Sequence, residues 1–211
     1  MAQGEREAVA AGRSVDEATT VAAARLGIRK DEAEVEVLDA GGRGWLGLGA
    51  REARVRVRRP SKGEAARRFV VAVAAVLGSS VEVVAEPPSA EGEAWAVTIA
   101  TGEASRWIGH RGQTLEALRV VADAAATRVS GSRERLVLDV GGYRERRAQE
   151  LRDMAKEMAA RARRLGRELT LEPMPPSDRR IVHMAVSELS GVSTSSVGEE
   201  PNRRVVISPA R

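Results

Sequence analysis

The chain has 211 residues, of which 43% are hydrophobic but only 2% aromatic, so its cores must be built mainly from Val, Leu, Ala and Ile. It contains no cysteine, which excludes disulfides and thiolate metal sites and fits a reducing compartment. The formal charge is −1 over residues 1–100 (14 cations, 15 anions) and +5 over residues 101–211 (20 cations, 15 anions), and a basic half suits a polyanionic partner.

The N-terminal part of the chain is predicted to form a small α/β module. Residues 5–27 are predicted to form a helix from their periodicity, although Ser14 begins a capping-box spacing and Gly12 favours a break. Either the helix starts at Ser14 or a short strand precedes it. Residues 34–38 and 54–58 alternate between apolar and charged side chains, which predicts two strands.

A glycine-rich stretch between these strands contains a literal G-x-G-x-x-G at Gly42, Gly44 and Gly47. The dinucleotide-binding fingerprint with this spacing must open a helix within a βαβ unit. A strand-like segment follows here instead, so we expect no dinucleotide site.

Arginines alternate along the second predicted strand, so Arg54, Arg56 and Arg58 share one face. They could bind phosphate, or they could pair with Glu34 and Glu36 on the neighbouring strand. We favour the pairing, and no chemistry is evident in this module.

A second module follows a boundary at residues 60–64, where proline and glycine interrupt the pattern. Its helices and strands are predicted at residues 64–77, 81–85, 94–100, in a short helix before Gly109, and at residues 113–129 and 135–140. The order is therefore α-β-β-α-α-β.

The turn between the last two helices is Gly109-His110-Arg111-Gly112. Glycines let another backbone approach closely, and the start of the next helix offers unpaired N–H groups and a partial positive charge. Such a turn suits a phosphodiester chain, although an ordinary glycine turn between helices would have the same sequence. The turn and the order of elements, over about residues 64–141, resemble a type II KH domain. That resemblance implies a fold whose GXXG loop clamps single-stranded RNA.

His110 and Trp107 could each affect how this turn binds a nucleic acid. The pair between the glycines is usually basic in that family, but His110 can be neutral at pH 7, so phosphate affinity is expected to be weaker or pH-dependent. Trp107, which precedes the turn, could stack a base. A tryptophan at a helix end is more often part of a core, and we favour that alternative.

A long helix is predicted from Tyr143 to about Arg167. Four cationic side chains fall within a narrow sector of it: Arg152, Lys156, Arg163 and Arg167. They could form a ridge that contacts a nucleic-acid backbone, or a solvated face with Glu–Arg pairs. Both alternatives remain open.

A short strand at residues 169–171 and a proline-rich segment precede a helix that Ser177-Asp178 is predicted to cap. On this helix Arg179 and His183 share one face, away from its apolar stripe. The Arg-x-x-x-His pattern resembles the R-three-H domain. The resemblance implies binding of single-stranded nucleic acid by Arg179 and His183, with Arg180 as a neighbour.

The whole chain, including Gly44–Ala50 before a strand, resembles the bacterial Jag family, also called KhpB or SpoIIIJ-associated. This resemblance implies an α+β fold of three small domains in tandem, with boundaries at 1–59 (Jag N-terminal domain), 60–66 (linker), 67–142 (type II KH domain) and 143–211 (R-three-H domain with its leading helix). It also implies a cytoplasmic RNA-binding regulator linked to cell elongation, division and envelope homeostasis, with a small single-KH protein as a partner.

The expected function is therefore binding. Backbone amides of Gly109–Gly112 and the charge of Arg111 would hold phosphates, while Arg179 and His183 would add a second contact on the same chain, which raises the effective concentration. The expected ligand is single-stranded RNA, with single-stranded DNA as an alternative. A different possibility is an adaptor whose N-terminal module recruits protein partners, with nucleic-acid binding secondary.

An enzyme is not expected. The chain has no G-x-x-x-x-G-K-[ST] phosphate loop, and its two histidines lie in separate predicted domains. No carboxylate cluster has metal-ligand spacing, so we expect no catalytic residue, metal or cofactor.

The polar N-terminus lacks a hydrophobic signal region, and the longest apolar run, Phe69 to Leu77, is far below the ~18 residues of a membrane span. A cytoplasmic protein without membrane insertion is expected, and its oligomeric state stays open.

Overall fold

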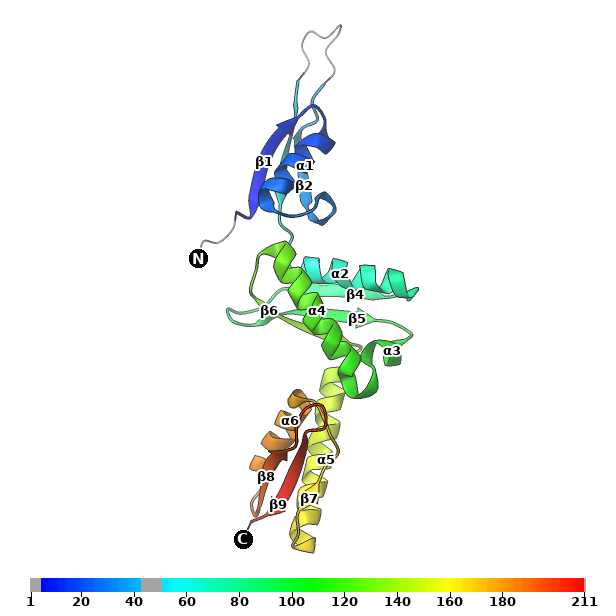
Figure 1. The fold of residues 1–211 in the computed structure, drawn as a ribbon, viewed down its shortest axis with the longest axis vertical. Helices are drawn as coiled ribbons and strands as arrows, with labels where there is room; N and C mark the ends of the chain where they lie inside the picture. Colours follow the sequence, from blue (N-terminus) through cyan, green and yellow to red (C-terminus); the bar gives the residue numbers. More distant parts are fainter. Residues whose placement is uncertain (1–4, 43–50, 211) are drawn as a thin grey trace. The chain divides into compact units, whose positions relative to one another are not determined.

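The computed structural model describes residues 5–42 and 51–210, so most of the G-x-G-x-x-G stretch lies outside the described residues. Helices and strands are mixed along the chain, and the described strands form three small three-stranded sheets (Figure 1). The α+β class is therefore confirmed. The chain divides into two compact units, the first formed by residues 1–104 and 115–139, the second by residues 105–114 and 140–211.

The first unit begins with an α/β module whose elements are β1 (Glu7–Gly12), α1 (Val15–Leu26), a single 3₁₀ turn (Lys30–Glu32), β2 (Glu34–Asp39) and β3 (Ala53–Arg58). The antiparallel sheet has the order β1-β3-β2, and α1 packs against β1 and β3. The prediction of a helix over residues 5–27 is wrong for residues 7–12, which form β1, and the alternative of a short strand before Ser14 is correct. The Ser14 hydroxyl accepts a hydrogen bond from the Glu17 amide at 3.2 Å, so the helix starts at its cap.

The arginine-bearing face of β3 pairs across the sheet. Arg56 contacts Glu36 of β2 at 3.0 Å, and Arg58 contacts Glu7 of β1 at 3.0 Å. Cross-strand pairing, rather than free guanidinium groups, thus accounts for Arg56 and Arg58. The other face of the strand is buried with α1, in a core formed by Ala10, Ala18, Ala22, Ala23, Leu26, Ile28, Val55 and Val57.

The predicted order α-β-β-α-α-β is present. The elements are α2 (Lys62–Leu77), β4 (Glu82–Glu86), β5 (Ala94–Ala100), α3 (Ala104–Ile108), α4 (Gln113–Ser130) and β6 (Arg135–Val140). The sheet order is β4-β5-β6, and α2 packs against β4 and β5. As expected from their alternation, Val97 and Ile99 of β5 are fully buried while Trp95 is partly buried.

A buried lysine fixes the start of α2. The Lys62 side chain is 2% exposed; it forms an ion pair with Asp123 of α4 at 2.7 Å and donates to the carbonyl of Glu134. The Trp95 ring lies against Gly63, where an added Cβ would come within 2.1 Å of the indole, and its Nε1 donates to the Glu134 carboxylate at 3.0 Å. Burying an ammonium group is costly unless it is paired and hydrogen-bonded, and Lys62 is both.

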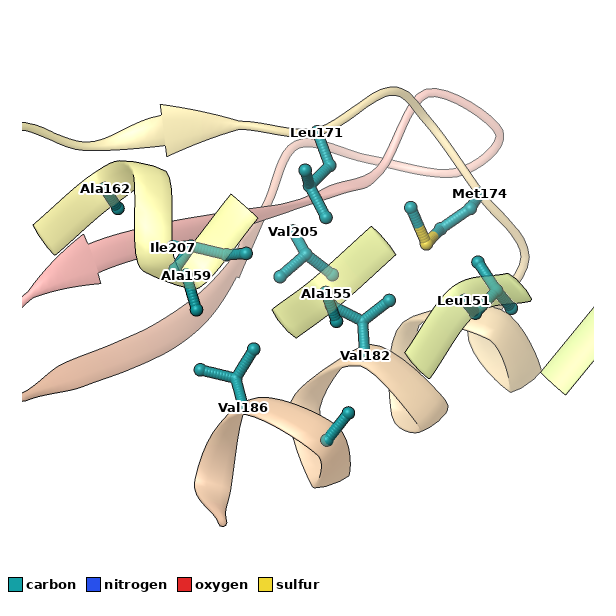
Figure 2. Packing of buried hydrophobic residues seen from close by; sticks show 11 residues of the cluster. Leu151, Ala155, Ala159, Ala162, Leu171, Met174, Val182, Val186, Val205 and Ile207 are labelled. Atoms are coloured by element: carbon teal, nitrogen blue, oxygen red, sulfur yellow. The ribbon is translucent and has the colours of Figure 1, made fainter. Parts of the chain in front are cut away.

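The C-terminal part of the second unit contains α5 (Tyr143–Leu165), β7 (Leu169–Thr170), α6 (Pro176–Ser187), β8 (Val192–Val197) and β9 (Arg204–Pro209). Its antiparallel sheet has the order β7-β9-β8. Figure 2 shows its core, in which small residues of α5 face larger ones of α6 and β9. The buried members are Leu151, Ala155, Ala159, Ala162, Leu171, Met174, Val182, Ala185, Val186, Val205 and Ile207.

The predicted cap of α6 is wrong. The helix begins at Pro176 with Pro175 at the capping position, and no side chain caps it. Proline needs no cap for its own missing N–H and has a backbone φ that suits a first turn. Asp178 instead is 7% exposed and contacts the Arg147 guanidinium of α5 at 3.1 Å. Burial raises the pKa of Asp178, and the charge of Arg147 opposes that rise.

Candidate nucleic-acid interface

The glycine turn that ends α3 has a backbone that few residues could adopt. Gly109 has φ 70° and ψ −173°, and Arg111 has φ 52°. An added Cβ on Gly109 would come within 2.0 Å of the Thr114 hydroxyl, and one on Gly112 (φ 81°) within 2.9 Å of the Tyr143 ring. Both glycines are therefore required, because the backbone is left-handed and because neighbouring side chains occupy the space.

The two polar residues of this turn differ in environment. His110 is exposed, whereas the Arg111 side chain is 31% exposed. The Arg111 guanidinium donates from Nη1 to the carbonyl of Pro173 at 2.8 Å and forms an ion pair with the Glu172 carboxylate. The turn is thus bound through Arg111 to the proline-rich segment before α6.

A groove of ≈ 600 Å³ lies beside this contact. It is lined by His110, Arg111, Gln113, Glu172, Pro173, Met174, Pro175, Pro176, Glu200, Pro201 and Asn202. Proline rings supply apolar walls, and the side chains of His110, Gln113 and Asn202 supply polar edges. The glycine turn of the second module and the segment leading into the Arg-x-x-x-His helix therefore share one groove within the second unit.

The arginine of the Arg-x-x-x-His pattern is buried. Arg179 is 8% exposed although it lies away from the apolar stripe of α6, because strand β8 and Glu200 cover that face. Its guanidinium donates to the Met174 carbonyl at 3.2 Å, to the Ser196 hydroxyl at 3.4 Å and to the Glu200 carboxylate. Arg180, the next residue, is exposed.

The histidine of this pattern is also held by strand β8. His183 Nδ1 lies 2.7 Å from the Thr194 hydroxyl, and Nε2 lies 2.7 Å from the Ser196 hydroxyl. Burial lowers the pKa of His183 and the nearby charge of Arg179 lowers it further, so both favour the neutral ring. Because Ser196 contacts both Arg179 and His183, the two side chains form one connected network.

Two other predicted contacts are placed by the structure. Trp107 is 3% exposed, so the core alternative is correct and its ring is not available for stacking. On α5, Arg152 contacts Glu145 at 3.3 Å and Arg163 donates to the Ser190 carbonyl at 3.1 Å. Lys156 and Arg167 are exposed and have no ion pair among the described residues. The four cations therefore do not form a uniform free ridge.

The residues that sequence reasoning missed are the partners of the predicted arginines. None of these partners, Glu172, Glu200, Thr194 and Ser196, belongs to a sequence motif. The run of hydroxyl residues along β8 (Ser193 to Ser196) is the available signal, since a buried Arg and a partly buried His need polar partners on the facing element.

Residues 5–42 and 51–210 contain no cluster of three or more His, Cys, Asp or Glu side chains that could hold a metal ion. None of the helices in these ranges is long and apolar enough to cross a membrane.

Comparison with known proteins identifies two matching family models and several relatives. The R-three-H domain model matches residues 149–209, and the Jag N-terminus model matches residues 10–59. The RNA-binding protein KhpB of Clostridium symbiosum is 34% identical over 200 residues, which cover 94% of this chain and 90% of that protein. The RNA-binding protein KhpB of Bacillus subtilis (strain 168) is 33% identical over 211 residues, covering 98% of this chain and 100% of that protein. Similarity at this level over nearly complete chains establishes common descent.

Proposed function

The chain belongs to the KhpB family, and from that membership we propose that it binds single-stranded RNA through the groove beside the glycine turn Gly109–Gly112. The observation that carries the proposal is that Arg111 of this turn and the segment before α6 line the same groove. Relatives named as RNA-binding proteins support the choice of ligand. Single-stranded DNA is the competing ligand.

The groove offers the contacts that an unpaired strand needs. Guanidinium groups bind phosphate oxygens in a bidentate manner, and the glycine turn places the Arg111 guanidinium in this groove. Unpaired bases can pack on the proline rings and present their edges to Gln113 and Asn202. His110 is exposed at the rim of the groove, where its ring nitrogens can hydrogen-bond to the strand.

The Arg-x-x-x-His residues are proposed to contribute in two ways. Arg180 is exposed and has no ion pair among the described residues, so it can contact phosphate directly. Arg179 and His183 bind hydroxyl groups of β8, and Arg179 also binds the carboxylate of Glu200. These contacts hold Glu200, which lines the groove, in place.

The finer features of the proposal follow the family resemblance. The protein would act in the cytoplasm as a binding protein rather than an enzyme, without a cofactor, and with a small single-KH protein as a partner. Its regulatory role would concern cell elongation, division and envelope homeostasis.

A second candidate function, a protein-interaction adaptor, is favoured by the exposed apolar side chains of β2: Val35 is 42%, Val37 50% and Leu38 41% exposed.

The test is a titration of the full chain against a fluorescein-labelled, mixed-sequence single-stranded RNA at low salt, followed by fluorescence anisotropy. Duplex RNA and single-stranded DNA of the same sequence serve as competitors, and gel analysis with Mg²⁺ present checks for cleavage. Saturable binding of the single strand, weaker competition by the duplex and intact RNA are expected. Absence of binding at low salt, or equal competition by the duplex, would refute the proposal.

A further inference from the structure

The guanidinium of Arg111 already has an anionic partner within the protein. It is bound by the Glu172 carboxylate and, at 2.8 Å, by the Pro173 carbonyl. Both charged side chains line the groove proposed to hold RNA. A phosphate that approaches Arg111 therefore meets a site that an internal carboxylate occupies.

Another anion can replace Glu172 as the partner of Arg111 in this ion pair. The Glu172 side chain is 75% exposed and that of Arg111 is 31% exposed, so water solvates the carboxylate and screens the pair. Exposed ion pairs contribute little stability, which means that a stronger anionic ligand can replace one partner at small cost. A phosphodiester presents two charged or partly charged oxygens to the guanidinium fork, as a carboxylate does.

The other acidic residue of the groove differs in this respect. Glu200 binds Arg179, whose side chain is 9% exposed and also donates to the Met174 carbonyl and the Ser196 hydroxyl. Displacing Glu200 would leave a buried guanidinium without its anionic partner, which is costly. Of the two groove carboxylates, Glu172 is the one placed to exchange.

We infer that Glu172 is an internal competitor of RNA: a phosphate of the bound strand takes its place on Arg111, and this exchange sets the affinity of the groove. The inference rests on the proposed function and specifies how the same site is regulated. When a phosphate binds Arg111, the Glu172 side chain moves away from the guanidinium, and no covalent bond changes. The phosphate then loses a bound solution cation, and the freed Glu172 carboxylate gains one. The Arg111 contact consequently adds little to the net release of counter-ions in the wild-type protein.

The test compares Glu172→Gln with Glu157→Gln. Glu157 is exposed on α5, lies outside the groove, and its replacement changes the net charge by the same amount. For Glu172→Gln, single-stranded RNA affinity should rise about 2- to 5-fold, the equivalent of an exposed ion pair. The plot of log K against log[salt] should steepen by roughly 0.7, the value for one added phosphate contact on a single strand. Glu157→Gln should change neither quantity by more than the small effect of net charge.

A second pair of variants separates a direct effect on Arg111 from a general loss of negative charge. In an Arg111→Ala background, Glu172→Gln should raise affinity no more than Glu157→Gln does. An equal gain with and without Arg111, or equal effects of the two glutamine variants, would overturn the inference while wild-type binding leaves the proposed function intact. If neither the wild type nor any variant binds RNA, the proposed function and this inference both fail. Thermal melts of all variants establish that each is folded.

Discussion

Glu200 accepts a hydrogen bond from the guanidinium of Arg179, an arginine that is 8% exposed and that also binds the Met174 carbonyl and the Ser196 hydroxyl. The Arg-x-x-x-His pattern therefore takes part in the packing of its own domain. This structural role decides how substitutions in the pattern should behave.

Arg179→Ala should destabilise the protein, whereas Arg180→Ala should not. Removing the Arg179 guanidinium leaves the buried Met174 carbonyl and the partly buried Ser196 hydroxyl without this donor, and the expected loss is about 1–3 kcal/mol in the free energy of unfolding. Arg180 is exposed without an ion pair in the described part of the chain, so its loss should lower RNA affinity alone. Thermal denaturation and anisotropy on both variants check this. Equal melting temperatures would show that Arg179 has no structural role.

The double variant His110→Asp with Arg111→Asp should lower RNA affinity by at least about 10-fold, because it places two carboxylates beside Glu172 in the groove. The matched control is Ala160→Asp with Arg161→Asp, which alters net charge equally on the exposed side of α5. Melting temperatures should change little in both, since His110 is exposed and the Arg111 ion pair is partly solvated. Equal loss of affinity in the control would remove the glycine turn from the binding site.

Gly109→Ala should destabilise the turn. The residue combines φ 70° with ψ −173°, a region that costs other residues about 1–3 kcal/mol, and the new methyl group would meet the Thr114 hydroxyl. Gly102→Ala is the control, because no atom lies within 4 Å of its added Cβ. The expected result is a lower melting temperature and weaker RNA binding for Gly109→Ala only. If both variants melt like the wild type, the observed backbone of the turn is not the one in solution.

Stability should fall on mild acidification because of His183. Its pKa is lowered by burial and by Arg179, so the unfolded state binds a proton at a higher pH than the folded state does. This contribution is fully present above the unfolded pKa of about 6.5, and is lost as pH falls from there through the lowered pKa. The difference in melting temperature between wild type and His183→Gln should shrink over that range. The exposed His110, replaced by Gln, provides the comparison; a pH-independent difference for His183→Gln would contradict the assignment.

Local patterns predict most of the fold, since they depend on neighbouring residues. Alternation locates the strands at residues 34–38 and 54–58, and spacing locates the glycine turn. The cap predicted for α6 is wrong because Ser177-Asp178 has the composition of a cap, while two prolines already provide a helix start. Asp178 is thereby left to pair with Arg147, a contact 31 positions away.

The candidate site is predictable only in part, for a related reason. Spacing identifies Arg111 and Arg179, but their partners lie far along the chain: Glu172 is 61 positions from Arg111, and Glu200 is 21 positions from Arg179. Periodicity indicates on which face of a helix or strand a side chain lies. It does not indicate which distant residues pack against that face. Burial of Arg179 and the shared groove therefore require the three-dimensional structure.

The buried ammonium group of Lys62 has a practical consequence for labelling. The chain has three lysines, and reagents that acylate or crosslink primary amines need a solvent-accessible, unprotonated side chain. Lys62 is 2% exposed, whereas the Lys30 side chain is 48% exposed and Lys156 is also exposed, so Lys30 and Lys156 are the readily modified lysine side chains among residues 5–42 and 51–210. Dye or surface attachment through Lys30 and Lys156 would therefore leave the groove residues chemically untouched, since none of them is a lysine.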